Sequence, residues 1–190
     1  MGVFATRNYY NLIENNDSDE NGQMGIYSDY GVETLIVGNN CFENSTNGLE
    51  IENGTRMTIT GNGGSSNTQN GIFLNYSTRT TCTGNTFSSN TQNGIELIGG
   101  SDNTITGNIC CANVRNGIVI SLSSNNTVTG NTTMDNDDND TGNYDGIHLS
   151  SANSTIVTNN TSKDNGRWGI MVDSDSDFNS IENNYTSGNT

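Results

Sequence analysis

Three carboxylic residues and one tyrosine recur at a spacing that would bring their side chains together. Asp29 and Glu52 are 23 residues apart, and so are Tyr27 and Glu50. If 23 residues form one structural repeat, these side chains lie on neighbouring strands, within about 5–7 Å of one another. Paired carboxylates at such separations can cleave a glycosidic bond by acid–base catalysis. Asp29, Glu50 and Glu52 are therefore candidate catalytic residues.

Aromatic and acidic side chains continue the same column. Phe73 follows Glu50 by 23 residues, and Glu96 follows Phe73 by the same interval. An aromatic ring beside carboxylates can hold a sugar, so Tyr27, Phe73 and Glu96 are candidate glycan-binding residues. The alternative is a solvated acidic face with no ligand, because Asp and Glu are ordinarily exposed.

The elements that would position these residues follow from a repeat that covers the chain. A glycine followed by an aliphatic residue recurs every 23 residues, with one interval of 29, at Gly2, Gly25, Gly48, Gly71, Gly94, Gly117, Gly146 and Gly169. Apolar residues, mostly Ile, Leu and Val, alternate with polar ones after each glycine, which predicts short strands with one buried face. One such unit cannot bury its apolar face alone, whereas stacked units can.

We therefore predict an all-β fold, a right-handed parallel β-helix of about eight 23-residue coils with three short strands each. A single domain spans residues 1–190, with a six-residue loop insertion within 131–145. Asparagine columns support this fold, because Asn suits tight corners and stacked Asn amides can form hydrogen-bonded ladders. One column recurs four residues before the glycine, where Gly142 is the exception, at Asn21, Asn44, Asn67, Asn90, Asn113 and Asn165.

Phrases such as NGIELIGGSDNTITGN and NGIVISLSSNNTVTGN resemble the right-handed β-helix repeats of pectate-lyase-like, NosD-like and archaeal surface proteins. The resemblance covers essentially the whole chain. It implies the fold, but such repeats carry lyases, hydrolases, epimerases and plain surface modules. Lyases of this kind typically use a basic residue, and the face of Asp29, Glu50 and Glu52 has none, since Arg56 and Arg79 lie elsewhere in their coils.

Composition excludes several partners. Six Lys and Arg against 21 Asp and Glu give a net charge of −15, which argues against nucleic acid and against an anionic membrane surface. No apolar run is long enough for membrane insertion. The first residues lack the basic start and long apolar stretch of a signal peptide, but the composition and the family resemblance favour an extracellular or cell-surface location.

Further residues are candidates for binding or modification. Alternating carboxylates suit Ca²⁺, and the insertion carries such a run at Asp135, Asp137, Asp138 and Asp140, for which a solvated loop is the alternative. Candidate glycosylation sites are Asn139, Asn53, Asn75 and Asn153. Three of the four cysteines are predicted to be small buried apolar residues. The lone His148 falls on an outward position, where its isolation gives no reason to assign it a role.

Three functions remain open. The first is a non-enzymatic extracellular or cell-surface module that self-associates head to tail into a filament through uncapped β-helix ends and binds glycan or Ca²⁺. The alternative explanation of the uncapped ends is that the chain is a fragment of a longer repeat array. The second is a polysaccharide-active enzyme of lyase, hydrolase or epimerase type that uses the acidic and aromatic face. The third is an ice-binding protein that uses a ladder of outward threonines, at Thr58/Thr60, Thr81/Thr83, Thr104/Thr106 and Thr127/Thr129.

Overall fold

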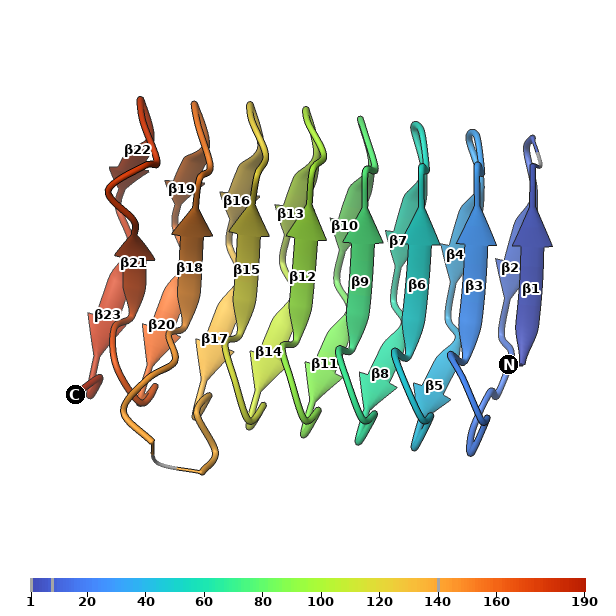
Figure 1. Ribbon diagram of the computed structural model, residues 1–190, viewed down its shortest axis with the longest axis horizontal. Helices are drawn as coiled ribbons and strands as arrows, with labels where there is room; N and C mark the ends of the chain where they lie inside the picture. Colours follow the sequence, from blue (N-terminus) through green and yellow to red (C-terminus); the bar gives the residue numbers. More distant parts are fainter. Residues whose placement is uncertain (1, 8, 140) are drawn as a thin grey trace.

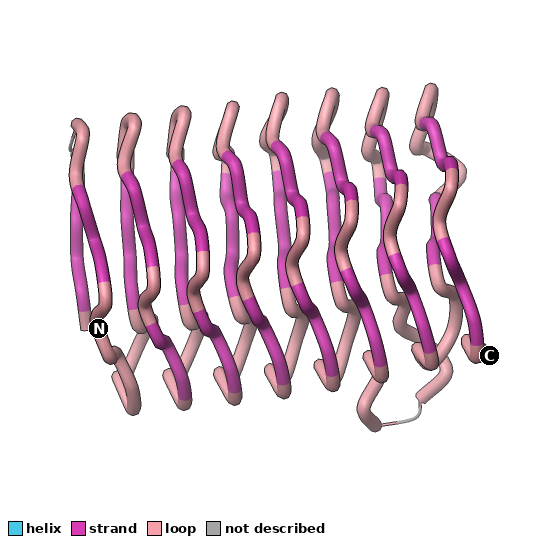
Figure 2. Tube along the Cα trace, turned by 180° about the vertical axis from the view of Figure 1, so that it is seen from behind, coloured by secondary structure: helices cyan, strands magenta, loops and turns pink. Residues whose placement is uncertain are grey.

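The chain forms a stack of coils along one axis, with its termini at opposite ends (Figure 1). A computed structural model describes residues 2–7, 9–139 and 141–190. Strands and turns make up these residues, and no helix capable of crossing a membrane occurs among them. The predicted β-helix, with about eight coils and three strands per coil, is confirmed (Figure 2).

Three parallel sheets run along the stack. The first two take one strand from each coil, and the third takes one from each coil after the first, where Asp17 forms only an isolated bridge to Asn40. The first sheet contains β1 (Val3–Thr6), β3 (Ile26–Asp29), β6 (Leu49–Glu52), β9 (Ile72–Asn75), β12 (Ile95–Ile98), β15 (Ile118–Ser121), β18 (Ile147–Ser150) and β21 (Ile170–Val172). The second contains β2 (Leu12–Glu14), β4 (Leu35–Val37), β7 (Thr58–Thr60), β10 (Thr81–Thr83), β13 (Thr104–Thr106), β16 (Thr127–Thr129), β19 (Ile156–Thr158) and β22 (Ser180–Glu182). The third contains β5 (Asn40–Phe42), β8 (Gly63–Ser65), β11 (Thr86–Ser88), β14 (Ile109–Cys111), β17 (Thr132–Met134), β20 (Thr161–Lys163) and β23 (Tyr185–Ser187).

The 23-residue period sets the register of each sheet. Ile72 pairs with Ile95, and Ile95 pairs with Ile118, so that equivalent side chains stack directly on one another. In the four-residue strands of the first sheet from β3 to β18, the first and third residues are buried and the second and fourth partly exposed. Each fully buried Ile or Leu contributes about 1.5–3 kcal/mol, so the stacked columns form one continuous core.

Buried asparagine ladders satisfy the hydrogen-bonding groups of the backbone at the corners of the coils. In one ladder, Asn62 donates from its backbone N and its Nδ2 to Asn85 Oδ1 at 2.8 and 3.0 Å. In the second, Asn113 donates to Asn136 Oδ1, and Asn136 donates to Asn165 Oδ1. The sequence-based assignment of Gly142 as the exception in this column is wrong. Because the extra residues follow Asn136 rather than precede it, Asn136 occupies the position.

The corners of the coils contain residues in the left-handed backbone region, and these are of the expected types. The residue before each ladder asparagine in the second sheet's corner has a positive φ, for example 64° at Gly61 and 52° at Asn15. Glycine reaches this region without a Cβ penalty, and Asn tolerates it. The scaffold therefore accounts for much of the Gly and Asn content.

The cysteines and threonines take the predicted faces. Cys41, Cys82 and Cys110 are buried, and Cys111 is half-buried, so three apolar cysteines are confirmed. Burial raises the pKa of the Cys82 thiol to about 12, which suppresses the reactive thiolate. The threonines of β7, β10, β13 and β16 are in register on the outer face of the second sheet. Their use in ice binding stays a prediction.

Candidate functional site

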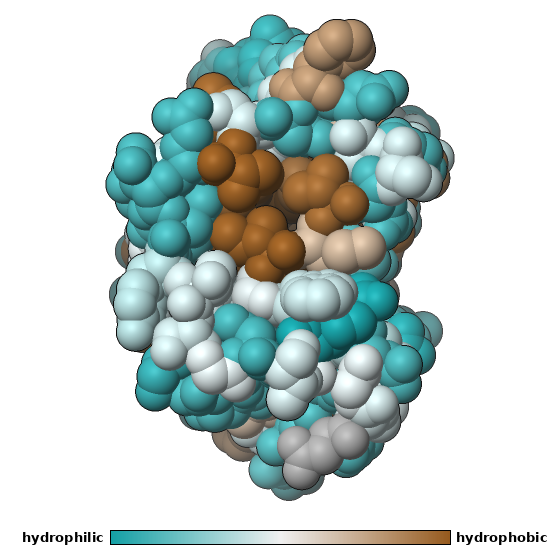
Figure 3. Space-filling view, turned by 90° about the vertical axis from the view of Figure 1, so that its left-hand side faces the viewer, coloured by the Kyte–Doolittle hydropathy of each residue, from teal (hydrophilic) through white to brown (hydrophobic). Residues whose placement is uncertain are grey.

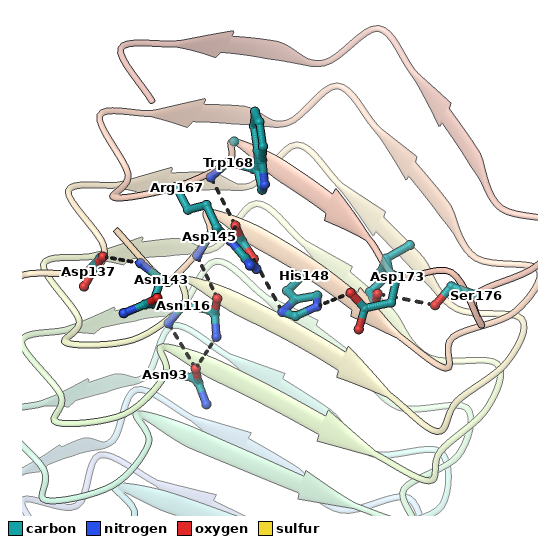
Figure 4. Close-up of polar contacts among 12 residues, drawn as sticks. Asn93, Asn116, Asp137, Asn143, Asp145, His148, Arg167, Trp168, Asp173 and Ser176 are labelled. Carbon is teal, nitrogen blue, oxygen red and sulfur yellow. Dashed lines mark hydrogen bonds and ion pairs between the residues drawn. The ribbon is translucent and has the colours of Figure 1, made fainter. Parts of the chain in front are cut away.

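Side chains of opposite charge meet on the outer face of the first sheet, near its C-terminal strands (Figure 4). Asp145 lies two residues before β18, and His148 is the second residue of β18. Arg167 lies three residues before β21, and Asp173 follows β21 directly. Because β18 and β21 are paired in register, these two coils place the four side chains side by side. We call this set the C-terminal cluster.

Asp145 occupies the end of a third asparagine ladder. Asn93 donates from its backbone N and Nδ2 to Asn70 Oδ1, and Asn116 donates in the same way to Asn93 Oδ1. In the next coil Asp145 takes the asparagine position, and its backbone N donates to Asn116 Oδ1 at 2.7 Å. The Asp145 side chain has no amide to donate, so its two carboxylate oxygens are available as acceptors.

A two-point ion pair satisfies this buried carboxylate. Asp145 is 0 % exposed. Arg167 donates from Nε to Asp145 Oδ1 at 2.9 Å and from Nη2 to Oδ2 at 2.6 Å, and Trp168 donates its backbone N to Oδ1 at 3.1 Å. These hydrogen bonds raise the pKa of Arg167 above its ordinary value. The fork geometry fixes the guanidinium on the surface of the sheet.

His148 lies between two carboxylates. Its Nδ1 is 3.5 Å from Asp145 Oδ2, and its Nε2 is 3.2 Å from Asp173 Oδ1. The His148 side chain is 20 % exposed, and its buried Nε2 has no hydrogen bond of good geometry despite this short distance. A half-buried imidazole held between two acids can accept and release a proton at a fixed position.

The interpretation of His148 as an isolated surface histidine is therefore wrong. The outward position was predicted correctly, but the side chain is enclosed by residues from two coils. A sequence signal does exist: the column Asn47, Asn70, Asn93 and Asn116 changes to Asp145 in the coil that contains the only histidine. An acidic substitution in a ladder of amides removes a hydrogen-bond donor and adds a charge, which the scaffold itself does not require.

The predicted acidic face also forms, on the same side of the same sheet. Tyr27 and Glu50 are register partners, and so are Asp29 and Glu52. Tyr27 donates its hydroxyl to Glu52 Oε2 at 2.6 Å, and its ring stacks on Phe4 with 5.4 Å between centroids. Burial, the hydrogen bond to Glu52 and the nearby carboxylates raise the Tyr27 pKa. We call Tyr27, Asp29, Glu50 and Glu52 the N-terminal acidic cluster.

The pKa of Glu50, in this N-terminal acidic cluster, is raised above its ordinary value. Burial raises its pKa, the hydrogen bond from Asn47 lowers it, and the neighbouring Glu52 raises it further. Phe73 and Glu96 continue the column as predicted, since β6, β9 and β12 are paired in register. No Lys or Arg ion pair to these carboxylates occurs in the described residues. Catalysis and glycan binding by this cluster stay predictions.

The acidic insertion is organised by its own hydrogen bonds. Asp137 is 2 % exposed and accepts hydrogen bonds from Thr141 and Asn143, which lower its pKa although burial raises it. Asp135 and Asp138 are exposed, while Asp140 lies outside the described residues. Among the described residues no group of three or more His, Cys, Asp or Glu converges on a metal position. Ca²⁺ binding by the insertion stays a prediction.

The predicted glycosylation sites differ in their surroundings. Asn139 is exposed in the insertion. Asn53 and Asn75 contact carboxylates of the N-terminal acidic cluster, and Asn153 accepts a hydrogen bond from the Asp177 backbone. Among the described contacts, Asn139 is thus the candidate glycosylation site whose side-chain amide makes the fewest hydrogen bonds.

Comparisons with known proteins agree with this fold. The family described as "Right handed beta helix region" matches residues 1–141. No curated protein sequence gives a significant match. The periplasmic alginate epimerase AlgG superposes with a TM-score of 0.84 at 19% identity, over 98% of this chain and 47% of that chain.

Two further solved structures are similar. The A-module of the Azotobacter vinelandii mannuronan C-5 epimerase AlgE6 has a TM-score of 0.78 at 13% identity, over 96% of this chain and 64% of that chain. The enzymatically active domain of bacteriophage CBA120 tailspike protein 2 has a TM-score of 0.66 at 13% identity, over 94% of this chain and 35% of that chain. The chain spans about half the length of the AlgG structures it matches.

Proposed function

The chain belongs to the right-handed β-helix family, and we propose that it acts on a polysaccharide through proton transfer at His148. The observation that carries this proposal is the placement of a half-buried imidazole between Asp145 and Asp173, with a fixed guanidinium beside it. Two of the similar structures are epimerases, of alginate and of mannuronan, which supports a polysaccharide substrate.

The C-terminal cluster has the parts that proton abstraction next to a carboxylate requires. Arg167 uses Nε and Nη2 for Asp145, and its Nη1 has no partner in the described residues. This third nitrogen can bind the carboxylate of an acidic sugar, which neutralises its charge and acidifies the adjacent C–H. His148 then takes the proton. In epimerisation water returns a proton to the opposite face of the carbanion, whereas in elimination the electron pair expels the β-glycosidic oxygen, which takes the proton from His148. Asp145 holds the orientation of the Arg167 and His148 side chains.

The substrate class is therefore an acidic polysaccharide, and the reaction type is epimerisation or elimination. An exposed aromatic side chain, Trp168, follows Arg167 and is 53 % exposed, so it can contact a sugar ring beside the reacting unit. The similar alginate epimerase is periplasmic, which supports a location outside the cytoplasm for this chain.

The test compares His148→Gln with Glu50→Gln on the same substrate panel. Purified chain is incubated with alginate, pectate and neutral glucans in deuterated water. Proton NMR detects inversion and deuterium incorporation, and ultraviolet absorbance detects unsaturated products. We expect activity on an acidic polymer, a loss of about 100-fold or more in H148Q, and near-normal rates in E50Q.

Two results would contradict the proposal. One is an inactive wild-type chain across all acidic polymers, and the other is an H148Q variant that keeps the wild-type rate. The inverse result, in which E50Q is inactive and H148Q is active, would assign the chemistry to the N-terminal acidic cluster.

A second candidate is the non-enzymatic module that associates end to end. One observation favours it: apolar side chains gather on the end of the stack next to the last coil (Figure 3). Ile170 and Val172 are partly buried there, and Ile181 is 41 % exposed. Sedimentation velocity of wild type and Ile181→Asp tests this, since association should rise with concentration in the wild type and weaken in the variant.

A further inference from the structure

A row of bulky exposed side chains follows the corner between the first and second sheets. The residue directly after each strand of the first sheet from β1 to β18 has a positive φ. At three of these corners the residue is large and apolar or aromatic: Tyr30, Tyr76 and Leu122 are 51 %, 61 % and 68 % exposed. They are 46 residues apart, which is two coils. We call these three residues the corner ridge.

The scaffold does not explain these large residues. The corner requires φ values near 50°, a region where bulky side chains are rare and cost on the order of 1–3 kcal/mol. The same corner carries residues suited to it in two other coils, Asn53 and Gly99, and Arg7 and Ser151 in the remaining two. Tyr30 and Tyr76 gain little burial in return, so the core gives no reason for their presence.

The tyrosine rings have fixed neighbours. A Cβ atom on Gly99 would lie 2.6 Å from Cε1 and 2.7 Å from Cδ1 of Tyr76, so the absence of a side chain at Gly99 makes room for this ring. The Arg7 guanidinium carbon lies 5.9 Å from the centroid of the Tyr30 ring, within cation–π range. The Arg7 guanidinium beside Tyr30 and the missing side chain at Gly99 beside Tyr76 thus set the places of the two rings.

The spacing indicates the ligand. Two coils correspond to about 9.5 Å along the axis, close to the length of a disaccharide in an extended chain. A chain with a two-fold twist presents the same apolar sugar face at every second unit, and aromatic rings stack on such faces.

The ridge also leads toward the C-terminal cluster. Leu122 follows β15, and β15 pairs with β18, which carries His148. From these observations we propose that the corner ridge binds an extended, β-linked polysaccharide parallel to the axis of the stack and directs it to the C-terminal cluster. This inference rests on the proposed function for the identity of the polymer.

The test uses the double variant Tyr30→Asn/Tyr76→Asn. Asn is the residue that the scaffold carries at position 53, so this variant should fold with unchanged or higher thermal stability. The matched control is Tyr185→Asn, which removes a tyrosine of 59 % exposure from the third sheet. Binding is measured by affinity gel electrophoresis with alginate, glucomannan and hydroxyethylcellulose, and by co-sedimentation with anionic lipid vesicles.

We expect the Y30N/Y76N variant to bind the retarding polymer about tenfold more weakly, while Y185N binds as wild type does. Wild-type affinity in Y30N/Y76N would overturn the proposal that the corner ridge binds a polysaccharide. Binding to vesicles that depends on the ridge, without binding to any polymer, would overturn it as well. If Y30N/Y76N binds the polymer normally while H148Q is inactive, the proposal for the corner ridge is wrong and the proposed function is retained. If polymer binding depends on the corner ridge but no polymer is turned over, the proposed function is wrong and the proposal for the ridge is retained.

Discussion

Two groups of charged residues lie on the outer face of one sheet, and they differ in how their charges are balanced. The N-terminal acidic cluster sits on β3 and β6, where three carboxylates face a tyrosine. The C-terminal cluster sits around β18 and β21, where Asp145 is paired with Arg167 and His148 lies between two acids. Four strand steps of about 4.8 Å separate Glu50 from His148, so the two groups are about 19 Å apart.

The difference shows where chemistry is built in a repeat protein. The N-terminal acidic cluster arises where the regular period places similar residues in register, which leaves like charges together. The C-terminal cluster arises where the repeat is broken, by an Asp in an asparagine ladder and by an insertion in the same coil. Groups of opposite charge and an imidazole then meet, and such mixed groups can move protons.

The largest expected effect is on stability, from Asp145→Ala. This change leaves the Arg167 guanidinium and the Trp168 backbone N without their acceptor. Removing one partner of a buried ion pair costs about 3–5 kcal/mol, and the partial exposure of Arg167 reduces this to about 2–3 kcal/mol. We expect Tm to fall by about 4–12 °C in calorimetry. Asp29→Ala is the control and should shift Tm by about 2 °C or less. Equal shifts in the two variants would mean that the carboxylates of the two clusters contribute equally to stability.

A smaller effect is expected from Asp145→Asn, which separates the ladder from the ion pair. The Asn side chain can donate from Nδ2 to Asn116 Oδ1, as Asn116 does to Asn93. It still accepts one hydrogen bond but loses the charge that orients Arg167. The Tm decrease should be about half that of D145A, while activity falls as far as in D145A. Full activity in D145N would show that Asp145 has only a structural role.

The smallest effect is expected from Glu50→Gln, and it depends on pH. Burial raises the pKa of Glu50, so the folded state disfavours the charged carboxylate. This stability penalty is absent below the ordinary glutamate pKa and grows as pH rises through the raised pKa of the folded state. The neutral E50Q should therefore be more stable than wild type at neutral pH, by about 1–3 °C in Tm, and equal to it at low pH.

The E50Q measurement compares the two clusters directly. A gain in Tm at neutral pH shows that burial of the Glu50 carboxylate, together with the neighbouring Glu52 charge, outweighs the hydrogen bond from Asn47. A Tm that falls at neutral pH would show instead that the hydrogen bond from Asn47 to Glu50 outweighs the repulsion. In that case both clusters would be stabilised by their charges.

Most of the scaffold could be predicted from the sequence. Ile72, Ile95 and Ile118 recur at one interval, and this interval alone fixes their register and their burial. The same reasoning placed Tyr27, Glu50 and Phe73 side by side. The prediction was wrong at Gly142, because the repeat interval does not determine on which side of Asn136 the extra residues lie. The hydrogen bonds of the asparagine ladder in the structure show that Asn136 occupies the position.

The sequence by itself determined the period, the inward columns and the outward columns, because parallel stacking turns a constant interval into a direct contact. Only the tertiary structure decided that Asp145, His148, Arg167 and Asp173 meet. These residues occupy different positions within their coils, and their contacts depend on side-chain direction at strand ends and corners rather than on the interval. The physical reason is that backbone hydrogen bonds propagate a repeat, whereas a charged cluster forms wherever buried charges find partners.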